Sequence, residues 1–187
     1  MALEIEAKFI HINPDNIRSR ARELGFEMIH PEFLMKRATF MFSDINISLR
    51  VRQEYEKVTM TYKDVHDHSI ATGTTEHEVV VSDFDTTLDI LKLTAKHDSI
   101  NYQESKRELW KKGNIELVLD TWPGTSTYIE IEAQTEDILK RIVWDMWLDY
   151  SEAIFGRVGR VYEALWIMTT PELNTIRELT FEKYPSI

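Results

Sequence analysis

The chain has 187 residues, of which 43% are hydrophobic and 29% charged, and this composition predicts a globular domain rather than a disordered chain. It contains no cysteine, which excludes disulfide bonds and thiolate catalysis and suits a reducing, cytoplasmic location. Its net charge of −10 makes duplex nucleic acid a poor partner, and the lack of a long apolar run argues against a membrane span or secretory signal.

Hydrophobic alternation and turn residues predict eight strands joined mainly by short turns. We expect the strands at residues 2–11, 27–42, 47–54, 57–65, 76–81, 100–110, 114–122 and 127–133. A first helix is expected from the N-cap Asn13 to Gly25, because Asn favours the start of a helix and Gly its end. Two further helices are expected at 84–96 and 135–151.

The region after the last strand is less regular. Helical segments are expected as far as about Met168, so that residues 1–168 form the main domain and residues 169–187 form a tail packed on it. Trp144 and Trp147 lie on the predicted helix 135–151, and we expect them to be packing residues.

The first strand reads LEIEAKFI, in which Glu4, Glu6 and Lys8 alternate with apolar residues. Such alternation gives a strand with one apolar and one polar face, and here the polar face carries only charges. Charged residues at similar alternating positions recur on later strands: Arg50, Arg52, Lys63, Glu76, Glu78, Arg107, Asp120, Glu130 and Glu132.

Two architectures fit these charged faces. For any single pair of glutamates, a sandwich with its charged faces in water is the simpler interpretation. The whole set favours a barrel whose apolar faces pack outward against helices and whose charged faces line the interior. Eight strands enclose just enough space for side chains or one small ligand.

The charges are of both signs, and this suggests a specific ligand. Two carboxylates close together repel each other unless a cation lies between them, and Mg²⁺ and Mn²⁺ prefer such oxygen ligands. Arginine and lysine in the same cavity need anions, and phosphate oxygens match the guanidinium fork. The pattern therefore indicates a site for a polyphosphate–metal complex.

The order of these motifs resembles the CYTH superfamily, also called triphosphate tunnel metalloenzymes. The resemblance rests on ExExK (Glu4, Glu6, Lys8), RxR (Arg50, Arg52), TxK (Thr61, Lys63), ExE (Glu76, Glu78), Asp120 and a last ExE (Glu130, Glu132), and it extends over residues 2–165. A single ExExK motif would be weak evidence for the family, whereas the whole set of motifs in this order is specific for it. Members include class IV adenylate cyclases, thiamine triphosphatases and inorganic triphosphatases.

The resemblance implies a mainly β (α+β) fold, an eight-stranded antiparallel tunnel barrel with a charged lumen and helices outside. It implies that Mg²⁺ or Mn²⁺ is held by four glutamates: Glu4, Glu6, Glu130 and Glu132. It implies phosphate binding by five cations: Lys8, Arg50, Arg52, Lys63 and Arg107. It assigns catalytic roles to Lys8 and to three lumen acids that hold a second metal or orient the cations: Glu76, Glu78 and Asp120.

The predicted function is metal-dependent hydrolysis of a small triphosphate by a monomer or homodimer. One alternative is cyclisation of ATP to cyclic AMP and pyrophosphate, and another is a binding module without turnover. Thiamine triphosphate would need an aromatic platform, for which Trp110, Trp122 and Tyr128 are candidates.

One position departs from the family pattern. The sixth strand of the family usually has a Lys and an Arg two residues apart, but Ser105 stands at the expected Lys position here. Because neighbouring strand residues face opposite ways, Lys106 and Arg107 cannot both join the site. We expect Arg107 to do so.

Overall fold

The computed structural model describes residues 5–44, 46–65 and 74–185, and the chain divides into two compact units. Unit 1 comprises Met1–Phe33, Ser105–Thr175 and Tyr184–Ile187, and unit 2 comprises Leu34–Glu104 and Ile176–Lys183. Glu4 of the predicted metal site lies outside the described residues.

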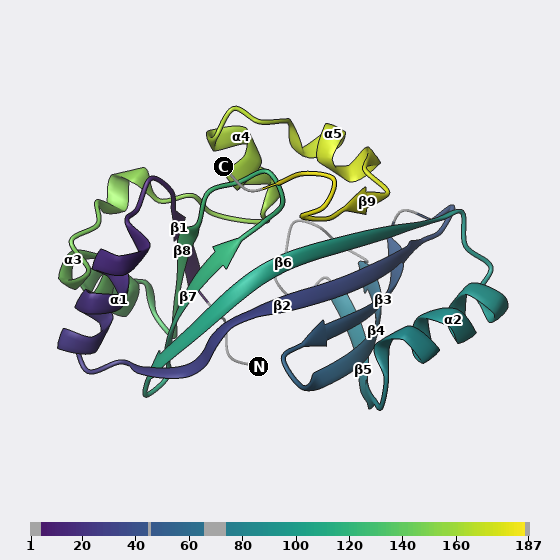
Figure 1. Cartoon of the computed structure of the whole chain (residues 1–187), viewed down its shortest axis with the longest axis horizontal. Coiled ribbons are helices and arrows are strands. Elements are labelled where there is room, and N and C mark those ends of the chain that lie inside the picture. The colour runs from purple at the N-terminus through teal and green to yellow at the C-terminus, as the bar shows by residue number, and fades with distance from the viewer. Residues whose placement is uncertain (1–4, 45, 66–73, 186–187) are drawn as a thin grey trace. The chain divides into compact units, whose positions relative to one another are not determined.

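Figure 1 labels the elements of both units. Unit 1 contains β1 (Ile5–Phe9), α1 (Pro14–Glu23), β7 (Ile115–Thr121), β8 (Tyr128–Ala133), α3 (Glu136–Asp145), the short 3₁₀ helix η1 (Tyr150–Glu152), α4 (Gly159–Ala164) and α5 (Thr170–Thr175). Unit 2 contains β3 (Ile47–Glu54), β4 (Lys57–Val65), β5 (Thr74–Val81), α2 (Phe84–Thr94) and β9 (Glu178–Leu179). Two long strands, β2 (Glu27–Met41) and β6 (Ser99–Lys112), have residues in both units.

The sheet of unit 1 is antiparallel, with the strand order β1-β8-β7-β6. Its apolar face packs against α1 and α3 (Figure 1). The buried core there includes Ala7, Phe9, Ile17, Ala21, Leu117, Leu119, Ile129, Ile131, Leu139, Ile142 and Val143. Because side chains alternate along a strand, this packing leaves the other face of the sheet to the charged residues.

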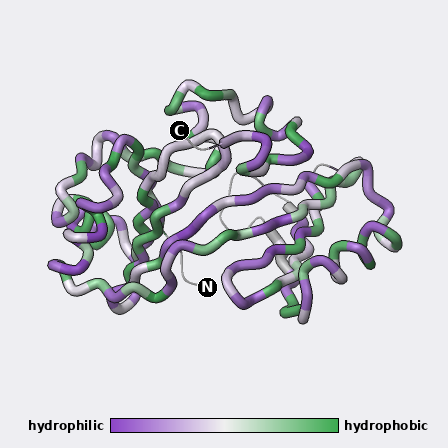
Figure 2. The backbone as a smooth tube through the Cα atoms, in the orientation of Figure 1, coloured by the Kyte–Doolittle hydropathy of each residue, from purple (hydrophilic) through white to green (hydrophobic). Residues whose placement is uncertain are grey.

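Unit 2 has the same plan, with the antiparallel order β2-β3-β4-β5. Its apolar face packs against α2 in a core of Ala38, Phe40, Val51, Val58, Phe84 and Leu88. In Figure 2, hydrophobic and hydrophilic residues follow one another at short intervals along these strands, as two-faced sheets require.

The predicted mainly β fold with helices outside an antiparallel sheet is confirmed, and five α-helices occur among the described residues. None of the helices described is long and apolar enough to span a membrane. The short strand β9 was not predicted. It pairs in parallel with β6, Tyr102 opposite Glu178, and buries Leu179 completely. The division into a domain of residues 1–168 and a packed tail stays a prediction.

The third helix is shorter than predicted, because it ends at Asp145 instead of near residue 151. The N–H of Leu148 donates to the carbonyl of Val143, and the N–H of Trp147 donates to the carbonyl of Trp144. These are the two bonds of a Schellman motif, which places Trp147 in the left-handed conformation with φ 60°. Glycine usually stands there, so the sequence carried no stop signal.

Candidate functional site

Lys8 of the edge strand β1 lies on the polar face of unit 1. Its ammonium group is 2.6 Å from Glu6 Oε1 and 2.9 Å from Glu130 Oε2, and its side chain is only 5% exposed. Burial alone would lower the pKa of Lys8, but the charges and hydrogen bonds of Glu130 and Glu6 outweigh it and raise the pKa. Lys8 is therefore held as a cation between two carboxylates.

Arg107 forms a second ion pair on the same face. Its guanidinium donates to both oxygens of Asp120, at 2.8 and 2.6 Å, and lies 3.9 Å from Glu130 Oε1. The Asp120 side chain is almost fully buried, so this bidentate pair fixes the guanidinium plane. Lys106 instead pairs with Glu32 at 3.6 Å. The structure thus places Arg107, and not Lys106, among the acidic residues.

A row of carboxylates crosses three strands beside Lys8. In the strand register Glu6 of β1 lies directly opposite Glu132 of β8, which in turn lies opposite Glu116 of β7. Like charges directly opposite each other destabilise a sheet unless a cation compensates. Lys111 pairs with Glu116 and supplies part of that compensation.

This donor set fits a hard divalent cation by its chemistry, since Mg²⁺ and Mn²⁺ take carboxylate oxygens. Glu6, Glu130 and Glu132 are the described residues that would hold it. No three acidic or histidine side chains in the described part of the chain are gathered closely enough to enclose an ion.

The polar face of unit 2 has an excess of cations. Arg52 of β3 lies directly opposite Arg37 of β2, and Arg50 lies opposite Thr39. The buried Nε of Arg52 has no hydrogen-bond partner among the described residues, although another guanidinium nitrogen is 3.3 Å from Glu54. Two guanidinium groups in opposite positions favour an anion between or beside them.

Acidic residues occupy the β5 edge of the same face. The hydroxyl of Thr61 donates to Glu78 Oε2 at 2.9 Å, and Lys57 lies 3.6 Å from the other oxygen. The hydrogen bond from Thr61, followed by the charges of Lys57 and Arg52, lowers the pKa of Glu78. Lys63 lies opposite Glu76 in the backbone register, and the side chain of Glu76 is not among those described.

The predicted site residues thus fall into two sets. Unit 1 brings together Glu6, Lys8, Arg107, Asp120, Glu130 and Glu132 on one sheet face. Unit 2 brings together Arg50, Arg52, Lys63 and Glu78. Ser105, two residues before Arg107 on β6, is completely buried and adds no charge.

Glu116 of these faces escaped the sequence interpretation, and Arg37 was left open by it, since Lys36 and Arg37 fit an exposed basic pair as well as a position of Arg37 at the mouth of the tunnel. Glu116 is four residues before Asp120 in one strand, and this even spacing is a signal that both share a face. Arg37 follows Lys36 directly, so only the register of the long strand β2 decides which of them joins Arg52.

All three candidates for an aromatic platform are buried. Trp110, Trp122 and Tyr128 are 3%, 4% and 1% exposed, and Trp110 belongs to the core beneath α1. A buried ring offers no open face for a substrate ring to stack on.

The family model for the CYTH domain matches residues 2–151. The PH1012 protein from Pyrococcus horikoshii OT3 is similar at 21% identity and a TM-score of 0.60, covering 81% of this chain and 94% of that chain. A putative adenylate cyclase from Vibrio parahaemolyticus has 12% identity and a TM-score of 0.62, with 87% and 98% covered. No curated protein matches the sequence.

Proposed function

Because the chain belongs to the CYTH domain family, we propose that it is a metal-dependent phosphohydrolase that acts on a small triphosphate. The substrate classes considered are inorganic triphosphate, nucleoside triphosphate and thiamine triphosphate. The proposal assigns metal binding to the acidic face of unit 1 and phosphate binding to the cationic face of unit 2.

The arginine row of unit 2 is the observation that carries the proposal. Arg37 and Arg52 lie opposite each other, with Arg50 on the neighbouring position of the same face and Lys63 on the next strand. A row of like charges attracts anions, and the planar guanidinium fork matches phosphate oxygens in pairs. A chain of phosphates supplies several such oxygens along its length.

Phosphoryl transfer depends on positioning and charge neutralisation rather than on covalent help. The guanidinium groups of Arg50 and Arg52 would bind phosphate oxygens and stabilise the charge of the transition state. A divalent ion held by Glu6, Glu130 and Glu132 would neutralise phosphate charge and lower the pKa of a bound water.

Lys8 would reach the substrate without leaving its carboxylates. An ammonium group has three donors, and Glu6 and Glu130 accept two of them. The third can be donated to a phosphate oxygen, while the two carboxylates hold the group in place.

Two acids would act as positioning residues. Asp120 fixes the plane of Arg107 through two hydrogen bonds, so that the remaining guanidinium N–H groups keep a defined direction. Glu78 accepts from Thr61 and lies near Lys57, which keeps its carboxylate charged beside the arginine row.

Product analysis tests the proposal. The purified chain is incubated with inorganic triphosphate, ATP or thiamine triphosphate, each with Mg²⁺, Mn²⁺ or EDTA. Metal-dependent release of orthophosphate from one substrate is expected. Release should be lost in Glu6→Gln and kept in Glu136→Gln, a control at an exposed helix position whose side chain contacts Lys140 and Tyr150.

The other outcomes separate the alternatives. Formation of cyclic AMP and pyrophosphate from ATP would mean that the reaction is cyclisation rather than hydrolysis. Tight binding of a triphosphate without turnover in any metal would leave a binding module.

A further inference from the structure

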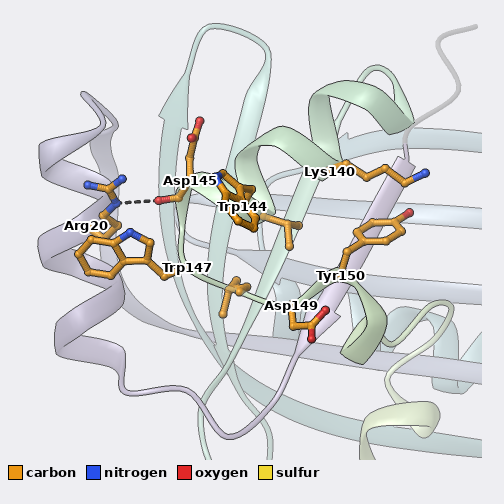
Figure 3. A pocket seen from close by; sticks show the side chains of 9 residues that line it. Arg20, Lys140, Trp144, Asp145, Trp147, Asp149 and Tyr150 are labelled. Carbon is orange, nitrogen blue, oxygen red and sulfur yellow. Dashed lines mark hydrogen bonds between the residues drawn. The ribbon is translucent and has the colours of Figure 1, made fainter.

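A pocket of about 640 Å³ opens on unit 1 beside α1 and α3, within the size range of small-molecule sites. It is lined by Arg20, Lys140, Val143, Trp144, Asp145, Trp147, Leu148, Asp149 and Tyr150. Figure 3 shows Trp147 beside Arg20 at one side, Lys140 above Tyr150 at the other, and Trp144 between them. None of these residues belongs to the candidate site described above.

The two tryptophans are not packing residues, contrary to the sequence prediction. Trp144 is 79% exposed and Trp147 is 73% exposed. Exposing large indole rings costs free energy, because burial of apolar surface is what stabilises the fold. Two of them at one pocket therefore indicate a ligand.

The backbone of Trp147 adds to that cost. The Schellman motif that ends α1 has Gly25 at its left-handed position, with φ 80°, whereas the motif that ends α3 has Trp147, with φ 60°. A bulky residue in this conformation is strained. Folding alone would favour glycine at both positions.

The rings of this pocket already attract cations. The guanidinium carbon of Arg20 lies 4.4 Å from the centre of the Trp147 ring, and Lys140 Nζ lies 5.1 Å from that of Tyr150. The most exposed ring, Trp144, has no such cation among the described residues. A cation within about 6 Å of an indole face is attracted by the ring electrons.

The charged residues that line the pocket also favour a cationic ligand. Arg20 pairs with Glu23 and Lys140 pairs with Glu136, so both cations are neutralised by their own helices. Asp145 and Asp149 form no ion pair in the described part of the chain, and within that part the carboxylate of Asp149 accepts hydrogen bonds only from Ser151. The pocket thus combines exposed aromatic rings with two carboxylates that lack a counter-ion.

We propose that this pocket binds an organic cation with an apolar body, of the substituted ammonium class. The ammonium group lies over Trp144 and is balanced by Asp145 and Asp149, and the apolar body contacts Trp147, Leu148 and Val143. This site is separate from the phosphohydrolase site, and the proposal does not depend on that function.

Choline and its uncharged analogue 3,3-dimethylbutan-1-ol are suitable probes, because they have the same shape and differ in charge. Each is titrated into the full chain while the indole N–H signals are followed by NMR. Choline should shift the Trp144 and Trp147 signals saturably and bind about tenfold or more tightly than the alcohol, the scale of one cation–π contact.

Three variants localise the effect. Trp144→Ala and the double variant Asp145→Asn/Asp149→Asn should each weaken choline binding about tenfold. Trp147→Gly should weaken choline binding while the chain melts at the same or a higher temperature. The matched control is Trp166→Gly: Trp166 is also left-handed at a helix end, with φ 58°, and 94% exposed, but does not line the pocket.

Equal binding of the alcohol would overturn the proposal, as would the absence of a saturable shift with choline. Unchanged choline binding in Trp144→Ala would do so too. Analytical sedimentation of the same samples tests whether a second copy of the chain fills the pocket instead. If the wild type is a dimer and Trp144→Ala is a monomer, the pocket is a dimer interface and the proposal of cation binding is overturned.

Discussion

The polar faces of the two sheets carry opposite excesses of charge. Among the described side chains, the unit 1 face has the acids Glu6, Glu116, Asp120, Glu130 and Glu132 against the cations Lys8, Lys111 and Arg107. The unit 2 face has the cations Arg37, Arg50, Arg52, Lys57 and Lys63 against the acids Glu54 and Glu78. Both faces arise from the same alternation, yet they are suited to ligands of opposite sign.

The two faces also differ in how their cations are held. In unit 1, Lys8 and Arg107 are fixed by carboxylates at 2.6 to 2.9 Å, which leaves the surplus acids to attract a further cation. In unit 2, the ion pair of Arg52 with Glu54 is longer, at 3.3 Å, and Arg52 also lies opposite the like charge of Arg37, a repulsion that an anion would reduce. This difference is the basis for proposing that one face binds metal and the other binds phosphate.

The largest effect is expected from Arg52→Ala. Loss of this guanidinium should reduce kcat/KM for the hydrolysed triphosphate by about 10²–10³-fold, as when a preorganised charge is removed from a transition state. Arg52→Lys keeps the charge but not the guanidinium fork, so its activity should lie between that of the wild type and that of Arg52→Ala. Steady-state kinetics measure this, with Lys92→Ala on the exposed side of α2 as control. A fall of less than about tenfold would argue against phosphate binding by this row.

A large effect on stability is expected from Arg107→Met. The variant leaves the nearly buried Asp120 carboxylate without its bidentate partner, which should lower the free energy of unfolding by about 3 kcal/mol. Urea denaturation measures it. The double variant Arg107→Met/Asp120→Leu removes both charges and should recover most of the loss. Equal destabilisation of the two variants would mean that packing, rather than the ion pair, is responsible.

Arg37→Gln should have a smaller effect, of opposite sign. Removing one of two like charges in opposite positions should raise the free energy of unfolding by about 0.5 kcal/mol without triphosphate. The rise in melting temperature on adding triphosphate should shrink at the same time. The control is Lys36→Gln, because Lys36 is the neighbouring residue on the other side of the strand. This variant should change neither the free energy of unfolding nor the rise in melting temperature with triphosphate. A destabilised Arg37→Gln would contradict the repulsion.

The smallest effect concerns the titration of Glu78. Its pKa is lowered from the ordinary 4.5, so its contribution to stability is present above that value and is lost as the pH falls through the lowered pKa. Thr61→Val removes the main cause and should move this loss to higher pH, which carboxyl NMR titration measures. Thr59→Val is the control, because its buried hydroxyl has no hydrogen-bond partner among the described residues. An unchanged Glu78 titration in Thr61→Val would exclude the hydrogen bond as cause.

Local periodicity accounts for the part of the fold that was predictable. The alternation in LEIEAKFI and TYIEIEA predicts both the strands and the faces of Lys8 and Glu130, which the register then brings together. Strand alternation excludes that Lys106 and Arg107 both join the site, and the family spacing of two residues from position 105 favours Arg107.

What could not be predicted depends on tertiary contacts. The two-residue strand β9 has no pattern of its own and exists through its pairing with β6. The end of α3 lacks a glycine, and apolar residues continue at helical spacing past its last turn. The exposure of Trp147 could therefore not be recognised from the sequence. Whether Lys36 or Arg37 shares a face with Arg52 depends on the register of β2 against β3. Hydrophobicity does not distinguish two adjacent cations, so the sequence pattern could not decide between them.

Calorimetric titration of two variants with two ligands tests the division of tasks most directly. Inorganic triphosphate and Mn²⁺ are titrated separately into wild type, Arg52→Ala and Glu132→Gln. The account predicts that Arg52→Ala loses affinity for triphosphate and keeps that for Mn²⁺, whereas Glu132→Gln loses affinity for Mn²⁺ and keeps that for triphosphate. Equal losses of both ligands in both variants would contradict it.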